Sequence, residues 1–190
     1  RAGRQSLESM LKRHAMGLHW EVRRLSPGQS AEEIALAELP GDWDVVVAAG
    51  GDGTVSGVAR AAHTTGTAVA IVPLGTGNVL SEQLQIPRDP EQAVGLLSSG
   101  AAVRRIDAME IDGCLYLLNA GTGLTAATVR DVRDEDKRRF GPSAYVWTGL
   151  ASTFTFRPRA CTVSIDGRSR RLRVLDISVI NAGFRFDYPV

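Results

Sequence analysis

The sequence has few of the residues that build metal centres or disulfide frameworks. Its 190 residues include 2 cysteines, Cys114 and Cys161, and 3 histidines, without a CxxC pair or metal-ligand spacing. These absences exclude a disulfide scaffold and a structural zinc site, and they favour a reducing compartment. Apolar runs approaching the roughly 20 residues that span a bilayer are missing too, as is a signal-peptide pattern.

Excess charge of either sign is also absent. The 22 lysines and arginines nearly balance the 21 acidic residues, for a formal net charge of +1. A dedicated nucleic-acid-binding domain normally carries a strongly basic face, so no nucleic-acid partner is expected. The chain starts at Arg1 without a methionine and ends at Val190 after a strand-like run, so we expect a fragment of a longer protein.

Helices and strands are expected to alternate over residues 1–105. Apolar periodicity, a capping box at Ser30 and Glu33, and glycine or proline boundaries predict helices over 5–16, 30–39, 55–63, 78–84 and 90–97, and strands over 20–25, 45–49 and 68–72. The runs at 45–49 and 68–72 are continuously apolar, as in strands buried on both faces. This order predicts an α/β domain with a mostly parallel sheet covered by helices on both sides.

The pattern of the chain changes after Val103. Asp112-Gly113 and Asp166-Gly167 each separate two strand-like runs, which is a strong hairpin signal. The expected strands cover 107–111, 115–119, 161–165 and 172–181, with a helix over 142–154. Residues 106–190 are therefore predicted to form a strand-rich, antiparallel second domain.

A glycine cluster, Gly50-Gly51-Asp52-Gly53-Thr54, follows the buried run at 45–49. Ligands of open α/β folds bind at the carboxyl edge of the sheet, where glycines let the backbone approach a phosphate and a helix N-terminus adds amide donors. Asp52 is suited to hold Mg²⁺-bound water or to accept a proton from an attacking hydroxyl. Thr54 can cap the next helix and donate to a phosphate oxygen. A plain turn is the alternative for this motif alone.

A second loop of the same design, Gly75-Thr76-Gly77-Asn78, follows the buried run at 68–72. Two such loops on neighbouring parallel strands would face each other across a crevice. Their occurrence as a pair favours a phosphate-binding site over two unrelated turns.

These two loops resemble those of the diacylglycerol kinase catalytic-domain superfamily, which includes bacterial lipid kinases and the sphingosine and ceramide kinases. The sequences GGDGT, PLGTGN and then Leu84-Gln85-Ile86-Pro87 carry the likeness. Weaker similarities cover much of the remaining chain, at Arg1–Arg4, Arg105–Asp107, Asn119–Leu124 and Lys137–Tyr145.

The resemblance implies a Rossmann-like nucleotide domain of the phosphofructokinase and NAD-kinase type, followed by a C-terminal β-sandwich that is incomplete here. The active site would lie in the cleft between them. The ATP phosphates would contact Gly50, Gly51, Gly53, Thr54, Gly75, Thr76, Gly77 and Asn78, with Lys137 and Arg138 as matching basic residues. Asp52 matches the family aspartate assigned to base or Mg²⁺-organising work. The implied enzyme is cytoplasmic and peripheral to the membrane, and it phosphorylates a lipid such as diacylglycerol with ATP and Mg²⁺; a homodimer is left open.

Several positions depart from the family pattern. Gly57 and Arg60 replace the Glu and Asn of GGDGTxxEVxNG, and Val79 replaces the Asp that commonly follows GTGN. Residues 125–127 hold no acid of the kind that sphingosine-type enzymes use for the substrate amine, which favours a neutral glycerolipid. The alternatives are an NAD-kinase-like or phosphofructokinase-like enzyme and a non-catalytic nucleotide or lipid sensor.

Two further signals stay outside this interpretation. Residues 121–126 fit the dinucleotide pattern GxGxxA, but the match is weak because no strand with a terminal acid follows at the right distance. Arg168, Arg170, Arg171 and Arg173 suit contact with anionic lipid head groups, and a solvent-facing strand explains them equally well.

Overall fold

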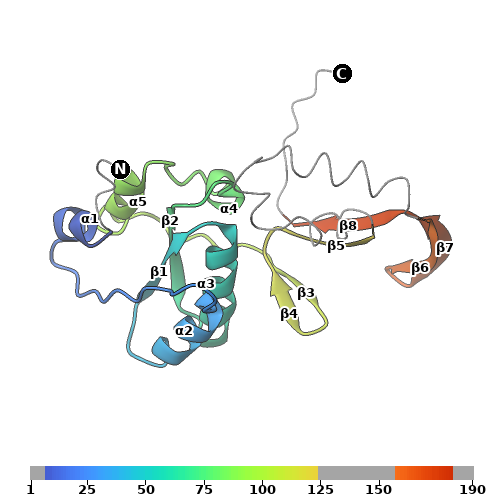
Figure 1. Ribbon diagram of the computed structural model, residues 1–190, viewed down its shortest axis with the longest axis horizontal. Helices are drawn as coiled ribbons and strands as arrows, with labels where there is room; N and C mark the ends of the chain where they lie inside the picture. Colours follow the sequence, from blue (N-terminus) through green and yellow to red (C-terminus); the bar gives the residue numbers. More distant parts are fainter. Residues whose placement is uncertain (1–6, 124–156, 182–190) are drawn as a thin grey trace, which may run out of the picture. The chain divides into compact units, whose positions relative to one another are not determined.

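The computed structural model describes residues 7–123 and 157–181 (Figure 1). The described residues form two compact units: one contains the chain up to Leu118 together with Asn181, and the other runs from Asn119 to Ile180. Within these ranges, no helix has both the length and the apolar character needed to cross a bilayer.

The first unit is an α/β structure. Its helices are α1 (Leu7–His14), α2 (Ala31–Glu38), α3 (Asp52–Thr65), α4 (Val79–Gln83) and α5 (Pro90–Gly95). Strands β1 (Val45–Gly50) and β2 (Ala68–Pro73) pair in parallel, from Val45 opposite Ala68 to Gly50 opposite Pro73. The predicted helices and both predicted parallel strands are confirmed, although α3 begins earlier than expected.

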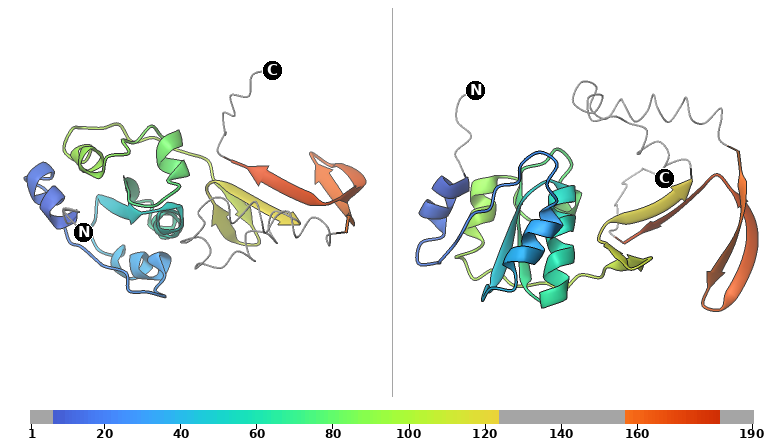
Figure 2. Two further views of the ribbon diagram at one scale, coloured as in Figure 1. Left: turned by 45° about the horizontal axis from the view of Figure 1, so that its top comes forward. Right: turned by 60° about the horizontal axis from the view of Figure 1, so that its bottom comes forward.

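Side chains of β1 alternate between two apolar cores. Val46 and Ala48 pack into the core that contains buried residues of α2 and α3, whereas Val47 and Ala49 pack against the buried residues of α1 and α5. Figures 1 and 2 show α2 and α3 on one face of the sheet and α1 and α5 on the other. The strand is therefore apolar throughout because both faces are covered, as predicted.

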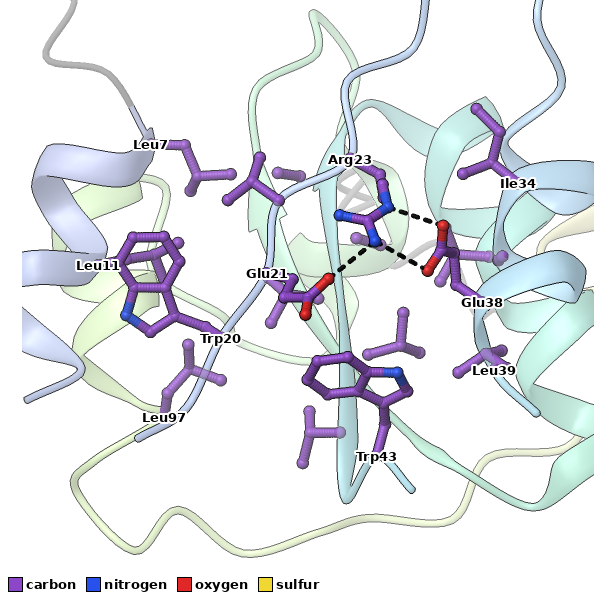
Figure 3. A pocket seen from close by; sticks show the side chains of 18 of the residues that line it. Leu7, Leu11, Trp20, Glu21, Arg23, Ile34, Glu38, Leu39, Trp43 and Leu97 are labelled. Atoms are coloured by element: carbon purple, nitrogen blue, oxygen red, sulfur yellow. Dashed lines mark hydrogen bonds and ion pairs between the residues drawn. The ribbon is translucent and has the colours of Figure 1, made fainter. Parts of the chain in front are cut away.

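The strand predicted over residues 20–25 is wrong, because this segment is extended without strand pairing. Its alternation has another cause: Trp20 and Val22 pack on the core of α1 and α5, while Arg23 binds the carboxylate of Glu21 at 2.8 Å. A strand needs a ladder partner. Residues 20–25 and β1 share no ladder of hydrogen bonds. Residues of both line a cavity of about 420 Å³ (Figure 3).

Both predicted Asp-Gly hairpins are present. Strands β3 (Met109–Ile111) and β4 (Cys114–Tyr116) pair across Asp112-Gly113, and β6 (Arg159–Ile165) and β7 (Arg168–Val174) pair across Asp166-Gly167. Both residues of each turn have positive φ, 51° and 76° in the first and 50° and 77° in the second. This is the conformation of the primed turns that match strand twist.

The strand predicted over 172–181 is wrong as a single element. The chain changes partners at Leu175, so that β7 pairs with β6 whereas β8 (Asp176–Ile180) pairs with β5 (Asn119–Gly123). Gly121 and Gly123 of the GxGxxA match lie in β5, and the rest of this match lies outside the described residues. The predicted helix over 142–154 lies outside the described residues, and the β-sandwich stays a prediction.

Candidate phosphate-binding site

The two glycine loops lie in direct contact at the carboxyl edge of the parallel sheet. β1 and β2 end in register, Gly50 opposite Pro73, and the Leu74 N–H donates to the Gly50 carbonyl oxygen at 3.0 Å. Just beyond, a Cβ atom added to Gly51 would lie 3.1 Å from the Gly75 Cα. The expectation that residues 50–54 and 75–78 meet is confirmed.

Close packing requires glycine at several of these positions. A Cβ atom on Gly75 would lie 2.8 Å from the Asn78 Oδ1, and one on Gly77 would lie 3.0 Å from the Asp52 Oδ2. Gly50 meets the side chain of Thr54 in the same way, at 2.6 Å. Gly53 differs, since a Cβ atom there would have no neighbour within 4 Å. Gly53 therefore faces open space, whereas Gly51, Gly75 and Gly77 allow the two loops to approach each other.

The N-terminus of α3 has no side-chain cap. Its N-cap residue is Gly51, and no side chain accepts a hydrogen bond there. The helices α2 and α5 are capped differently: Ser30 accepts from the Glu33 N–H, and Asp89 accepts from the Gln92 N–H at 2.9 Å. Since the first-turn amides of a helix lack intrahelical partners and carry the positive end of its dipole, the start of α3 favours an anion.

Asn78 holds the second loop in shape. Its Oδ1 accepts from the Gly75 N–H at 2.9 Å, and its Nδ2 donates to the Gly75 carbonyl oxygen at 2.7 Å. The residue has a left-handed φ of 54°, which asparagine tolerates better than most residues. Both polar atoms of the side chain are thus used within the loop. The phosphate contact predicted for Asn78 is untested, and its side chain acts here as a positioning group.

Asp52 links the two loops through its carboxylate. Its Oδ1 accepts from the Leu80 N–H in the first turn of α4 at 3.2 Å, and thereby supplies the cap that the Asn78 side chain does not. The Leu80 amide is a partner that no local pattern could reveal, because the two residues are 28 positions apart. The catalytic and Mg²⁺ roles predicted for Asp52 stay predictions.

The helix-capping role predicted for Thr54 is wrong. α3 begins at Asp52, so Thr54 lies inside its first turn, and its side chain packs where a Cβ atom of Gly50 would be. The N-cap position is taken by Gly51, whose backbone is extended with a φ of −91° and a ψ of −175°, so the helix starts two residues before Thr54. Lys137 and Arg138, the predicted basic contacts, lie outside the described residues.

Two departures from the family pattern have a structural explanation on the far side of α3. A Cβ atom on Gly57 would lie 3.1 Å from the Glu32 backbone nitrogen, so glycine permits close packing of α2 on α3. Arg60 binds the Glu32 carboxylate at 2.6 Å across the same contact. Sequence reasoning missed this pairing, because the two partners belong to helices that meet only in the folded chain.

The apolar cavity beside β1 is a separate feature. Figure 3 shows Trp20, Leu11 and Leu97 at one end of it and Trp43 and Leu39 at the other. Its lining lacks the glycine amides of the second loop, and it offers an anion mostly hydrocarbon. The arrangement suited to phosphate is therefore the loop pair and not this cavity.

Residues 1–111 match the family model described as the diacylglycerol kinase catalytic domain. The chain belongs to this family. Curated relatives include the probable lipid kinase YegS-like of Stenotrophomonas maltophilia, 32% identical over 160 residues that cover 78% of this chain and 51% of that protein. The diacylglycerol kinase of Bacillus subtilis is 32% identical over 142 residues, 73% of this chain and 45% of that protein.

Members of the diacylglycerol kinase catalytic family are also similar in structure. A crystal structure of a diacylglycerol kinase from Bacillus anthracis strain Sterne has a TM-score of 0.64 and 22% identity, and the match covers 96% of this chain and 61% of that chain. At this identity the likeness shows the α/β fold alone. The chain spans about half, or less, of the length of the curated relatives it matches.

Proposed function

We propose that this chain carries the nucleotide-binding part of an ATP-dependent lipid kinase, which transfers the γ-phosphate to the hydroxyl of a lipid such as diacylglycerol. The observation that carries the proposal is the contact between the Gly51 and Gly75 loops beside the uncapped start of α3. This arrangement supplies amide donors and a helix dipole, and the glycines themselves add no side chains there. Membership of the family supports the kinase class, and the names of the relatives support a lipid acceptor.

The proposed transfer needs positioning and charge neutralisation more than covalent chemistry. Backbone amides of Gly51, Gly53, Thr76 and Gly77 would hold the phosphates, since the Gly75 N–H already donates to the Asn78 Oδ1. The lipid hydroxyl oxygen forms the new bond to the γ-phosphorus, the bond to the β,γ-bridging oxygen breaks, and ADP leaves. Asp52 would accept the hydroxyl proton at Oδ2, because its Oδ1 is held by the Leu80 N–H.

The carboxylate of Asp52 also fits a Mg²⁺ ion held mainly by the nucleotide. Among the described residues, no group of three His, Cys, Asp or Glu side chains could hold a metal. Mg²⁺ commonly binds one or two carboxylates together with phosphate oxygens and several waters, so a single carboxylate beside a polyphosphate suffices. When bound, the ion would neutralise phosphate charge, and Asp52 would hold it directly or through water.

The acceptor we propose is a neutral glycerolipid at the cytoplasmic face of a membrane, where the enzyme is a peripheral visitor. Residues 1–105 would form the nucleotide domain and residues 106–190 part of the substrate domain. The sensor alternative loses part of its basis, because Gly57 serves the contact between α2 and α3. Val79 remains in its favour.

Labelled ATP with Mg²⁺ and a panel of acceptors separates the proposed functions. The panel contains diacylglycerol, ceramide, sphingosine, undecaprenol and NAD. Label on diacylglycerol supports the proposal, and label on NAD supports the kinase of NAD-kinase type. Nucleotide binding without transfer to any acceptor supports the sensor.

Two substitutions of Asp52 separate its chemistry from its structural role. Asp52→Asn keeps an oxygen for the Leu80 N–H but removes the charge, so we expect a normal fold and at least about a hundredfold loss of transfer. Asp52→Ala also removes the cap of α4 and should cost about 1 kcal/mol of stability. Turnover and denaturant unfolding measure the two effects, and near-normal transfer by Asp52→Asn would refute the assigned role.

A further inference from the structure

Positive charge is concentrated in the β6–β7 hairpin. Residues 159–174 contain five arginines and one aspartate, a net charge of +4, whereas the whole chain carries +1. The arginines are Arg159, Arg168, Arg170, Arg171 and Arg173, and all are exposed. A local excess of this size produces a strong positive potential that the overall composition conceals.

The arginines of the first unit are arranged differently. Arg13, Arg23, Arg24 and Arg60 each bind a glutamate, at distances between 2.6 and 3.0 Å. In the part of the chain that the structure describes, none of the hairpin arginines forms an ion pair. Their charge is therefore available to an anionic partner.

The register of the hairpin places arginines on both of its faces. Arg168 and Arg170 lie opposite Ile165 and Val163 and share one face with them, whereas Arg171 lies opposite Thr162 on the other face. A strand that lay flat on a charged surface would use only one of these two sets. Both sets are used at once when the tip of the hairpin enters an anionic layer that surrounds it.

The tip also carries an exposed apolar side chain. Ile165, the last residue of β6 before the turn, is 67% exposed, and Leu172 on the same face is 44% exposed. An apolar group flanked by arginines matches the membrane interface, where hydrocarbon lies beneath anionic phosphates. A nucleic acid would offer phosphates to the arginines but would leave the Ile165 side chain exposed to water.

We propose that the β6–β7 tip docks into the surface of an anionic membrane, with Ile165 entering the interface and the β7 arginines near the turn, on both faces of the hairpin, contacting lipid phosphates. This inference rests on the proposed lipid-kinase function, because an enzyme with a bilayer-resident acceptor must reach that surface. The docking device is distinct from the phosphate-binding loops, which belong to the other unit.

Co-sedimentation of the 190-residue chain with vesicles, without ATP, tests the proposal. We expect binding to mixed phosphatidylcholine–phosphatidylglycerol vesicles, little binding to phosphatidylcholine alone, and weakening with salt. Arg170→Gln with Arg171→Gln removes one arginine from each face and should weaken binding roughly tenfold or more, since each arginine near an anionic surface adds about fivefold. Ile165→Ser should weaken the binding that persists at high salt.

A matched double variant of the first unit serves as the control. Arg24→Gln with Arg88→Gln removes the same charge from exposed side chains that bind Glu8 and Glu82, and should bind vesicles like the unchanged protein. Circular dichroism checks that each variant is folded. Equal loss in the two double variants, equal binding to both vesicle types, or binding to an oligonucleotide but not to vesicles would overturn the proposal. Phosphorylation of a soluble short-chain diacylglycerol tests the kinase separately, so each idea can fail alone.

Discussion

Single glycines determine how closely the two phosphate loops approach. A Cβ atom on Gly75 would lie only 2.4 Å from the Gly51 Cα and has no room, whereas one on Gly51 would make a tight contact of 3.1 Å with the Gly75 Cα. The need for a residue without a side chain arises from the contact between the two loops, because each glycine packs against the backbone of the opposite loop. An isolated Gly-rich turn carries no comparable constraint.

Gly75→Ala should push the loops apart. Its new methyl group would meet the Gly51 backbone and the Asn78 Oδ1, an overlap worth about 1–3 kcal/mol of stability, and would displace the amides that we propose bind phosphate. Thermal unfolding and ATP binding by calorimetry measure the two losses. Gly95→Ala in α5 is the control, since its methyl group meets nothing within 4 Å and should be neutral or slightly stabilising. Equal behaviour of the two variants would contradict the explanation.

Asn78 should be more sensitive to loss of its donor and acceptor than to a change of charge. Asn78→Ala removes both hydrogen bonds to Gly75 and places alanine at a φ of 54°, so we expect a loss of about 1–3 kcal/mol. Asn78→Asp keeps the acceptor for the Gly75 N–H and should lose less. Chemical denaturation of the unchanged protein and the two variants ranks their free energies of unfolding. An alanine variant as stable as the unchanged protein would show that the hydrogen bonds between Asn78 and Gly75 do not stabilise the loop.

At the scale of elements, helix starts that are capped by a side chain differ from a helix start whose first-turn amides remain free to bind a ligand. Ser30 and Asp89 close the starts of α2 and α5, and Asp52 closes that of α4, whereas α3 starts at Gly51 without a side-chain partner. The capping box and the proline at position 90 could be predicted from the sequence, because a cap and its helix are adjacent along the chain. Asp52 was not readable as a cap, since it reaches a different helix.

The extended segment at residues 20–25 is held by exposed ion pairs and should loosen in acid. Arg24 hydrogen-bonds to Glu8 and its charge lies nearby, which lowers the pKa of Glu8 below the ordinary value. A carboxylate with a lowered pKa stabilises the folded form above that pKa, and this contribution is lost as the pH falls through it. Hydrogen exchange of α1, which the Glu8–Arg24 pair connects to this segment, should therefore be faster in Glu8→Gln than in the unchanged protein near neutral pH.

The same comparison in acid provides the check. The difference between the two proteins should be small, because both side chains are exposed and screened by salt, and should vanish once Glu8 is protonated. A difference that persists well below the ordinary glutamate pKa of about 4.3 would show that Glu8 acts otherwise.

At the scale of the whole molecule, the chain separates into a unit with the loops and a unit with the basic hairpin. If the loops bind nucleotide, the gain in stability belongs to the first unit. Mg²⁺–ATP at a concentration of a hundred times its dissociation constant should raise the free energy of unfolding of that unit by about 2.7 kcal/mol. Hydrogen exchange should slow in β1, β2 and α3 but not in β6 and β7, and slowing confined to the hairpin would contradict the assignment of the site.

Much of the first unit followed from the sequence, because its signals are local. Continuous apolar runs predict the buried strands at 45–49 and 68–72, each observed one residue longer, and Asp112-Gly113 predicts the hairpin of this unit. In the second unit, Asp166-Gly167 predicts the other hairpin in the same way. The sequence also places both glycine loops at strand ends. It failed for residues 20–25, where one-sided packing imitates a strand, and at Leu175, where the chain changes its strand partner.

Tertiary structure decided which groups remain free for function. The order of residues cannot show that the Asn78 side chain hydrogen-bonds to Gly75, or that one carboxylate oxygen of Asp52 accepts from the Leu80 N–H. It also cannot show that Gly57 and Arg60 contact α2. Each of these depends on a partner brought close only by folding. The amino-acid sequence therefore determined the elements and the loops, while the packing of distant segments determined the role left to each side chain.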